Sequence, residues 1–316
     1  MSLADALPEF DQPGRGALRE AVAFAQRRLP KRSALRDDTL AGVNGAVASV
    51  PDGMASGVLA GVNPIYGLYS CMIGPIIGGM FSSTRLMVVT TTSVASLTAG
   101  QALAGRSQES RADALFLLVL LAGVFQALLG IVQAGRLTRF VSYSVMSGFI
   151  AGIAVLTILS QLSTAAGYDA SGANRVMETW DLVRHAGDLS VVSIGITVLA
   201  LALAVLLPRT VLGPFGTLLA IVIPSVVVLL ASIGGVQIVK DVGEFPGGVP
   251  RPHLPDFTLF SPDVITGGLA VGIVTLIQGA GVSQTVPNPG GRENSMSRDF
   301  VAQGAANIGC SMFRGL

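Results

Sequence analysis

Three groups of polar side chains lie inside or beside long apolar stretches of this 316-residue sequence. The first is Pro51-Asp52, in the middle of the apolar run 40–62. The second is the hydroxyl run Thr90-Thr91-Thr92-Ser93, which leads into a short apolar segment. The third is Gln278, at the end of another apolar run. Such groups are costly at bilayer depth, so they normally face a protein interior or a cavity and mark ligand or proton sites.

Asp52 is the most unusual of these residues, because it is a carboxylate at the centre of a segment long enough to cross a membrane. About 20 apolar residues suffice to span the hydrocarbon. The neighbouring Pro51 removes an intrahelical hydrogen bond and clashes with the preceding turn. The functional interpretation is a ligand or proton site. The alternative is a kinked helix whose aspartate is satisfied by a neighbouring backbone or side chain.

The hydroxyl run predicts a discontinuous span. Residues 86–89 form a short, partly β-branched run, and residues 94–103 are too few to cross a membrane. A short extended piece followed by a half-length helix can point N-terminal N–H groups at an anion near the midplane. The alternative is a short ordinary helix with a Ser/Thr-rich cap.

The composition is that of an integral membrane protein, and it is this protein that must position the three polar groups. The chain is 51% hydrophobic and 12% charged, whereas soluble domains carry about 25% charged residues. The first 30 residues lack the long apolar core of a signal peptide. No basic patch interleaved with aromatics points to nucleic acid, and no catalytic Ser/His/Asp set, paired aspartates or HExxH points to an enzyme. We expect Cys71 and Cys310 to be buried thiols.

The sequence predicts nine apolar segments behind a basic amphipathic lead-in over residues 1–37. Most of the 20 Lys and Arg residues fall in the lead-in and in alternate connections, which predicts a cytoplasmic N-terminus in the cell (inner) membrane. Residues 167–189 read as a polar loop. The expected segments are 40–62, 65–81, 94–103, 112–134, 141–162, 191–207, 211–233, 265–277 and 300–312.

Three stretches resemble the SulP anion transporters, the sulfate permease or solute carrier 26-like family. VPDGMASGVLAGVNPIYGLYS resembles the family's first-helix signature, FSSTRLMVV the element before its third helix, and AANIGCSMFRGL the stretch before its tenth helix. The three occur in family order and at similar spacing. The resemblance covers nearly the whole chain and is weakest between residues 165 and 265.

The resemblance implies an all-α polytopic fold of two inverted seven-segment repeats, arranged as a core and a gate, with short extended pieces before half-helices. The first repeat would span about 38–235 and the start of the second about 262–316, within a transmembrane domain over 38–316. The implied function is elevator-type symport or exchange of a small anion such as sulfate, bicarbonate or a dicarboxylate. The anion would lie between half-helices three and ten, near helices one and eight. The implied substrate-binding residues are Asp52, Ser56, Thr90, Thr91, Thr92, Ser93 and Gln278.

The chain departs from the family pattern at three places. Val89-Thr90 stands where the family has Gly-Pro before helix three. Asp52 stands where glutamine is usual, and Gln278 where Asp or Glu is frequent, so we expect both to face one cavity and Asp52 to couple transport to H⁺ or Na⁺. The alternative is that Asp52 is a tolerated substitution and Gln278 a helix-packing amide. The chain ends where helix ten should begin, so we expect the tenth helix and the family's STAS domain to be absent.

Two other functions stay open at this point. A nucleobase permease shares the inverted-repeat architecture, although it typically carries acidic residues on helices eight and ten. A truncated, non-transporting membrane remnant would explain the early end of the chain. No cofactor beyond a coupling ion is expected, the partners are the anion and the bilayer, and dimerisation is left open.

Overall fold

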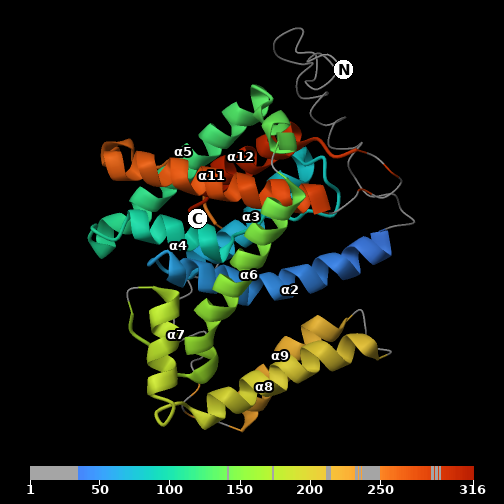
Figure 1. The fold of residues 1–316 in the computed structure, drawn as a ribbon, viewed down its shortest axis with the longest axis vertical. Helices are drawn as coiled ribbons and strands as arrows, with labels where there is room; N and C mark the ends of the chain where they lie inside the picture. Colours follow the sequence, from blue (N-terminus) through green and yellow to red (C-terminus); the bar gives the residue numbers. More distant parts are fainter. Residues whose placement is uncertain are drawn as a thin grey trace. The chain divides into compact units, whose positions relative to one another are not determined.

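The structure is a computed structural model that describes residues 35–140, 142–172, 174–210, 215–231, 234, 236, 250–285, 288, 291 and 293–316 (Figure 1). The basic lead-in is outside this range except for its last three residues, as is most of the polar stretch 236–249. The chain divides into two compact units, residues 1–43 and 44–316. Helix α2 runs through the boundary.

The described residues are helical and contain no strand. Each of the nine predicted apolar segments contains or overlaps a helix, which confirms the all-helical prediction. The α-helices are α2 (Leu35–Leu59), α3 (Ile65–Phe81), α4 (Ser93–Ala102), α5 (Gln108–Ile131), α6 (Tyr143–Ala166), α7 (Arg175–Arg184), α8 (Val191–Leu206), α9 (Gly216–Leu230), α11 (Pro262–Thr285) and α12 (Met296–Met312).

Helix α7 corrects the prediction of a polar loop over residues 167–189. Asn174 begins this helix by accepting a hydrogen bond from the N–H of Met177 at 3.0 Å, a standard N-cap arrangement. Charged residues alternate with apolar ones along the segment, so its mean hydropathy is low even though its apolar residues recur at helical spacing. The low mean hydropathy of the whole segment led to the prediction of a loop, although the segment contains an amphipathic helix.

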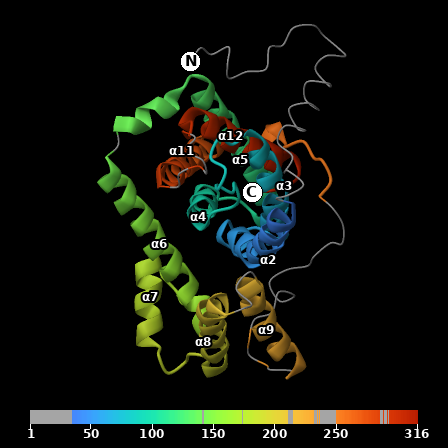
Figure 2. The same ribbon diagram turned by 90° about the vertical axis from the view of Figure 1, so that its right-hand side faces the viewer.

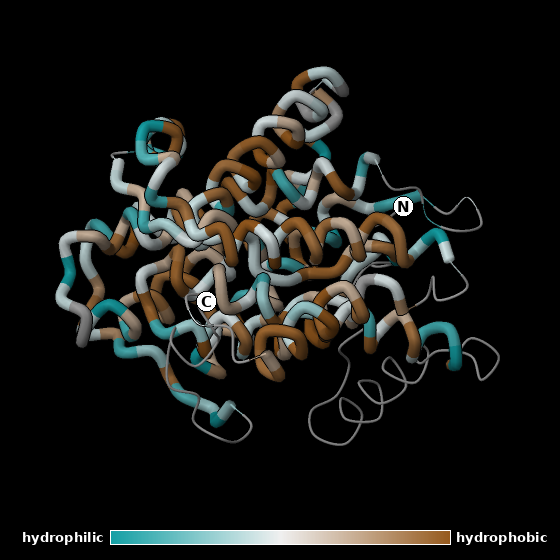
Figure 3. The backbone as a smooth tube through the Cα atoms, turned by 90° about the horizontal axis from the view of Figure 1, so that it is seen from below, coloured by the Kyte–Doolittle hydropathy of each residue, from teal (hydrophilic) through white to brown (hydrophobic). Residues whose placement is uncertain are grey.

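Four of the described helices are long and apolar enough to cross a membrane, by length and composition. They are the segments Ser110–Ile131, Ser147–Ala166, Val191–Arg209 and Pro262–Thr285. Figure 3 shows the hydrophobic stretches following the helices, with hydrophilic residues concentrated in the connections. Helix α2 continues through Pro51, while Asn63-Pro64 separates α2 from α3 as the sequence predicts.

The longer helices pack through glycines that bring their backbones into contact. On α5, a side chain at Gly123 would lie 2.8 Å from the carbonyl oxygen of Gly304 on α12. On α3, a side chain at Gly67 would overlap the carbonyl oxygen of Gly53 on α2. Because lipid removes the usual hydrophobic drive for helix association, membrane helices gain contact by such close approach of small residues.

Two groups of helices can be distinguished within residues 44–316. Helices α3, α4, α5, α11 and α12 form one network of contacts, in which α12 packs on both α5 and α3, and α11 packs on α5 and α4. Helices α6 to α9 form the other, with α6 packed on α7 and α8, and α8 on α9. Figures 1 and 2 both show α7 beside α6 and α8 beside α9.

A buried carboxylate, Asp299 in the first turn of α12, holds the α3–α4 connection. Its Oδ1 accepts hydrogen bonds from the N–H groups of Ser83 at 2.6 Å and Thr84 at 3.2 Å. Its Oδ2 accepts from the hydroxyls of Thr84 at 2.6 Å and Ser283 at 2.9 Å. The Ser82 and Ser83 hydroxyls also lie within 3.1 Å of Oδ1. This carboxylate, with no solvent exposure, joins segments more than 200 residues apart.

Asn288 and Ser295 extend this cluster. The side-chain oxygen of Asn288 accepts from the N–H of Arg85 at 2.7 Å, and its amide donates to the carbonyl of Ser83 at 3.0 Å. The N–H of Ser295 donates to the Ser83 hydroxyl at 2.8 Å. The turn over residues 82–85 (the SSTR turn) therefore forms hydrogen bonds with Asn288 and Ser295, which both follow α11.

We predict that Asp299→Ala destabilises the protein by about 3–5 kcal/mol, because breaking a buried hydrogen-bond network is among the most destabilising effects of a single substitution. The physical reason is that the N–H and hydroxyl donors of the turn would be left buried and unpaired. Thermal unfolding of the purified chain in detergent measures the loss. Asp263→Ala is the matched control, because Asp263 also lies in the first turn of a helix but is exposed. Equal losses in the two variants would contradict the assignment.

Candidate functional site

Thr92 sets the start of α4. Its backbone is extended, with φ −134° and ψ 140°, and its hydroxyl accepts a hydrogen bond from the N–H of Ala95 at 3.4 Å. The same hydroxyl donates to Oε1 of Gln278 on α11 at 3.0 Å. Thr92 thus fixes this N-terminus against α11 without the proline that the family pattern has before helix three. The short-helix prediction is confirmed at Ser93–Ala102.

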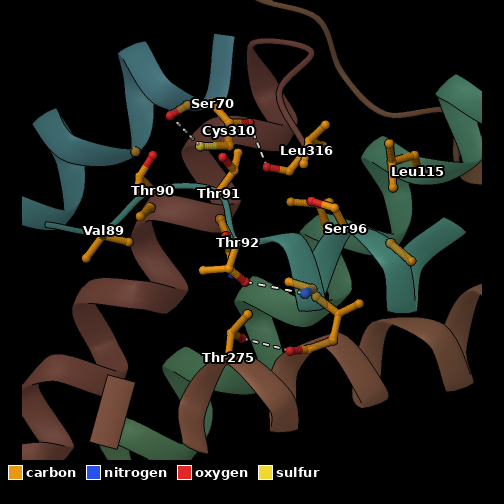
Figure 4. A pocket seen from close by; sticks show the side chains of 17 residues that line it. Ser70, Val89, Thr90, Thr91, Thr92, Ser96, Leu115, Thr275, Cys310 and Leu316 are labelled. Atoms are coloured by element: carbon orange, nitrogen blue, oxygen red, sulfur yellow. Dashed lines mark hydrogen bonds between the residues drawn. The ribbon is translucent and has the colours of Figure 1, made fainter. Parts of the chain in front are cut away.

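A cavity of about 50 Å³ opens beside this helix terminus (Figure 4). At roughly 10–15 Å³ for each water-sized probe position, this is room for a few water molecules or one small ion. Its walls come from α3, the 87–92 segment, α4, α5, α11 and α12, and all the lining side chains are uncharged. The polar residues among them are Ser70, Thr90, Thr91, Thr92, Ser96, Thr275 and Asn307.

Two hydroxyls of the predicted run interact with α3. The thiol of Cys71 lies 3.3 Å from the Thr90 hydroxyl and 3.6 Å from the Thr91 hydroxyl. Both cysteines are free thiols, as the sequence analysis expects, although only Cys310 is fully buried. On the same wall, the Ser70 hydroxyl donates to the carbonyl oxygen of Leu316 at 2.6 Å.

Ser96 is the polar group most available to a ligand. It is 1% exposed, lies one turn into α4 and lines the cavity. Among the described residues, its hydroxyl has no hydrogen-bond partner. A buried polar group without a partner costs free energy, so an unpaired hydroxyl at a cavity wall is suited to a bound ion or water.

A chain of side-chain amides supports the far wall. Gln126, buried in α5, accepts a hydrogen bond from the Asn307 amide at 2.7 Å and donates to the carbonyl of Gly272 at 3.3 Å and to the Thr275 hydroxyl. None of these residues is among the site residues predicted from the sequence. Asn307 lies within the quoted AANIG stretch and Thr275 one turn before Gln278, so helical spacing was the signal that could have found both.

The structure brings only part of the predicted site together. Thr90, Thr91 and Thr92 line the cavity. Gln278 is not a lining residue, but it accepts a hydrogen bond from the hydroxyl of Thr92. Ser93 is the first residue of α4 and is not a lining residue. Neither Asp52 nor Ser56 on α2 lines this cavity.

The two α2 residues differ in environment. Ser56 is fully buried, and its hydroxyl has no hydrogen-bond partner among the described residues. The Asp52 side chain is exposed. The cation-coupling role of Asp52 stays a prediction. Among the described residues, no group of three or more His, Cys, Asp or Glu side chains is arranged to hold a metal ion.

Comparison with known proteins identifies the family. The model of the Sulfate permease family matches residues 35–316. This chain belongs to the sulfate permease family. It is 26% identical over 289 residues to "Sulfate transporter 4.1, chloroplastic" of Arabidopsis thaliana, covering 87% of this chain and 42% of that protein. It is 26% identical over 298 residues to "Bicarbonate transporter BicA" of Picosynechococcus sp., covering 89% and 51%.

Solved structures share the fold of this sulfate permease family member. The transmembrane domain of the cyanobacterial bicarbonate transporter BicA superposes with a TM-score of 0.72 at 22% identity, covering 91% of this chain and 74% of that one. Murine Solute Carrier 26 family member A9, in the inward-facing state, also gives 0.72 at 20% identity, covering 98% and 56%. The resemblance seen in the sequence is confirmed, and the protein is a multi-pass membrane protein. The chain spans about half the length of the curated relatives it matches.

Thr92→Ala should destabilise this sulfate permease family member by about 2 kcal/mol. About 1 kcal/mol comes from the lost N-cap and about 1 from the lost hydrogen bond to Gln278. Thermal unfolding in detergent measures the change. Thr98→Ala is the control on the same helix, because its hydroxyl bonds only to the Val94 carbonyl and alanine is a good helix former. A Thr92→Ala protein as stable as Thr98→Ala would show that the cap does not hold the helix.

Proposed function

We propose that this chain forms part of a secondary active transporter for a small anion such as sulfate, bicarbonate or a dicarboxylate, and that the anion binds in the cavity at the start of α4. The observation that carries this proposal is the buried, unpartnered hydroxyl of Ser96 in the wall of that cavity. Helix N-termini favour anions, because their first N–H groups and the helix dipole are oriented toward the ligand.

The absence of charged side chains among the residues that line the cavity is consistent with a site that binds an anion and then releases it. Hydroxyl and amide donors from Thr91, Ser96 and Asn307 can replace part of an anion's hydration shell, while no lysine or arginine side chain lines the cavity. A buried cation would hold the anion more strongly, since charge-assisted hydrogen bonds are about twice as strong as neutral ones. Modest affinity suits a site that must release its substrate on the other side of the membrane.

The size of the cavity favours a small anion over a nucleobase, the alternative that the sequence left open. About 50 Å³ accommodates only a few water molecules, whereas pockets for organic ligands usually measure 300–1,000 Å³. The names of the relatives, a sulfate transporter and a bicarbonate transporter, are consistent with this choice.

The proposed mechanism is an elevator motion of a core against a gate within an inverted-repeat fold. The contacts of α3, α4, α5, α11 and α12 with one another and of α6 to α9 with one another support this division, and α6 joins the two groups through contacts with α4 and α11. A cytoplasmic N-terminus, a location in the cell membrane and a homodimer belong to the same proposal. In it, Asp52 accepts H⁺ or Na⁺ and compensates the charge of the anion.

Ser96→Leu should abolish anion binding, because the larger side chain fills the cavity. Ligand binding to the native state raises its stability, so thermal unfolding of the purified chain with and without sulfate or bicarbonate measures it. Ser96→Ala should weaken the effect by about five- to tenfold in affinity, the equivalent of one hydrogen bond of about 1–1.4 kcal/mol. Thr98→Ala, on the same helix but outside the cavity wall, should bind as wild type.

Two outcomes would overturn the assignment of the site. One is sulfate- or bicarbonate-dependent stabilisation that persists unchanged in Ser96→Leu. The other is stabilisation of the wild-type chain by uracil or xanthine but by none of the anions, which would support the nucleobase permease instead.

Asp52→Asn should remove the pH or sodium dependence of anion uptake while leaving anion binding at the α4 cavity intact. The reason is that the amide has no proton to exchange in this range and no negative charge to hold Na⁺. Uptake of labelled sulfate and bicarbonate by a full-length version of the protein in proteoliposomes, across a pH series with and without sodium, measures the effect. Unchanged uptake with unchanged pH and sodium dependence would exclude the coupling role.

A further inference from the structure

Helix α7 exposes its apolar face. Val176, Met177, Trp180 and Val183 lie on one side of the helix and are 64%, 54%, 58% and 61% exposed. Only Leu182 among its apolar residues is buried. A surface helix of a water-soluble domain has the opposite arrangement, with its apolar stripe facing the core. The exposed side of α7 is thus an apolar surface, which is expected to contact lipid or another protein surface rather than water.

The polar face of α7 is already occupied by contacts within the protein. Arg175 pairs with Glu178 on the same helix. Asp181 accepts a hydrogen bond from the N–H of Ser171 at 3.0 Å and lies 3.2 Å from Nδ1 of His185. The Ser171 N–H and His185 hold the pKa of Asp181 below its usual value, so this carboxylate stays charged in place. The polar face is covered by the connection from α6.

The neighbours of α7 place it at the edge of the membrane. It follows α6 and precedes α8 in the chain, and it packs on α6. Both neighbours are long and apolar enough to span, and only 6% of the apolar window of each is buried inside the protein. The N–H of Ser190, just before α8, donates to the carbonyl of Ala166, the last residue of α6, at 3.0 Å. The Thr197 hydroxyl donates to the carbonyl of Ala165 at 3.0 Å. The end of α6 and the start of α8 are therefore at one level, and the C-terminal end of α7, at Arg184, is only six residues before Ser190.

An apolar groove runs along the exposed side of α7. It has a volume of about 340 Å³ and is lined by Leu159 of α6 and by residues 176, 177, 179, 180 and 183. At its rim, the guanidinium carbon of Arg184 lies 5.4 Å from the centre of the Trp180 ring. Tryptophan is enriched at membrane interfaces, where its ring contacts acyl chains and its N–H stays in the headgroup region.

We propose that the exposed apolar side of α7, which runs alongside α6 (Figures 1 and 2), faces lipid and that its groove binds a phospholipid. The acyl chain lies against Leu159, Met177 and Trp180, and the headgroup phosphate is at Arg184. The positive charge at one end of an otherwise apolar groove matches a molecule with an anionic head and an apolar tail. This assignment goes beyond anion transport and does not depend on it.

A second copy of the chain is a weaker candidate for the same face. Ten helical residues are about 15 Å long, so one face about 10 Å wide presents roughly 150 Å². A stable protein interface buries about 800 Å² on each partner. A bound phospholipid needs no such area, because it contacts only the groove and its rim.

Trp180 allows a direct test, because it is the only tryptophan in the chain. The 316-residue chain is reconstituted into vesicles of phosphatidylcholine and phosphatidylglycerol, with and without bromine on the acyl chains near the headgroup. Brominated lipid should quench most of the Trp180 emission, and aqueous iodide should quench little of it. Strong iodide quenching with none by bromolipid would overturn the proposal, because the face would then be in water. Quenching by neither agent would also overturn it, because protein would then cover the face.

A matched reporter keeps the result interpretable. Trp180→Phe combined with Gly187→Trp moves the tryptophan to the nearby loop, where a side chain at Gly187 would meet nothing within 4 Å. This variant should show the reverse pattern, with iodide quenching stronger than bromolipid quenching. The same quenching pattern for both positions would contradict a specific lipid-facing side of α7.

The role of Arg184 is tested by lipid composition. In wild type, raising the share of phosphatidylglycerol should increase quenching by a brominated phosphatidylglycerol more than by its phosphatidylcholine counterpart. Arg184→Gln should abolish this preference and retain the acyl-chain quenching. If Arg184→Gln kept the preference for phosphatidylglycerol unchanged, the proposed contact between the headgroup phosphate and Arg184 would be wrong.

Discussion

The buried carboxylate of Asp299 is the constraint on which the rest of the described core depends. The oxygens of a buried carboxylate need hydrogen-bond donors from within the protein, so the turn that meets them must supply donors from several directions. The SSTR turn does so with backbone N–H groups and hydroxyls, and Ser283 adds one from α11. Only residues 86–92 connect this turn to α4, so the turn limits where α4 can begin.

The position of α4 follows from that attachment at one end and from Thr92 at the other. Thr92 ends the non-helical segment, caps the helix and bonds to Gln278. The half-length helix therefore starts inside the protein rather than at its surface, and an internal helix start leaves room for a cavity with hydroxyl walls. A proline is one way to build such a start, and here hydrogen bonds from threonine replace it.

The protein uses two kinds of apolar surface for different purposes. Glycines such as Gly123 and Gly304 let α5 and α12 approach until their backbones touch, which excludes lipid from the core. Helices α6, α7 and α8 instead leave large apolar side chains uncovered. Since lipid is as apolar as these side chains, uncovered leucines and valines are no liability there. Trp180 and Arg184 mark the level at which that apolar surface meets the headgroups.

The sequence by itself determined the class of the protein, its apolar helices and the family, because length, apolarity and local signatures are properties of contiguous residues. It also indicated the hydroxyl run at 90–93 as the start of a short helix. It could not show that Asp299, rather than the conspicuous Asp52, is the buried carboxylate in the described core, since burial depends on residues more than 200 positions away. The amide pair Gln126–Asn307 was hidden because its members are 181 residues apart, and the helix α7 because the mean hydropathy of its segment is low. Only the tertiary structure decides which polar groups meet and which faces stay uncovered.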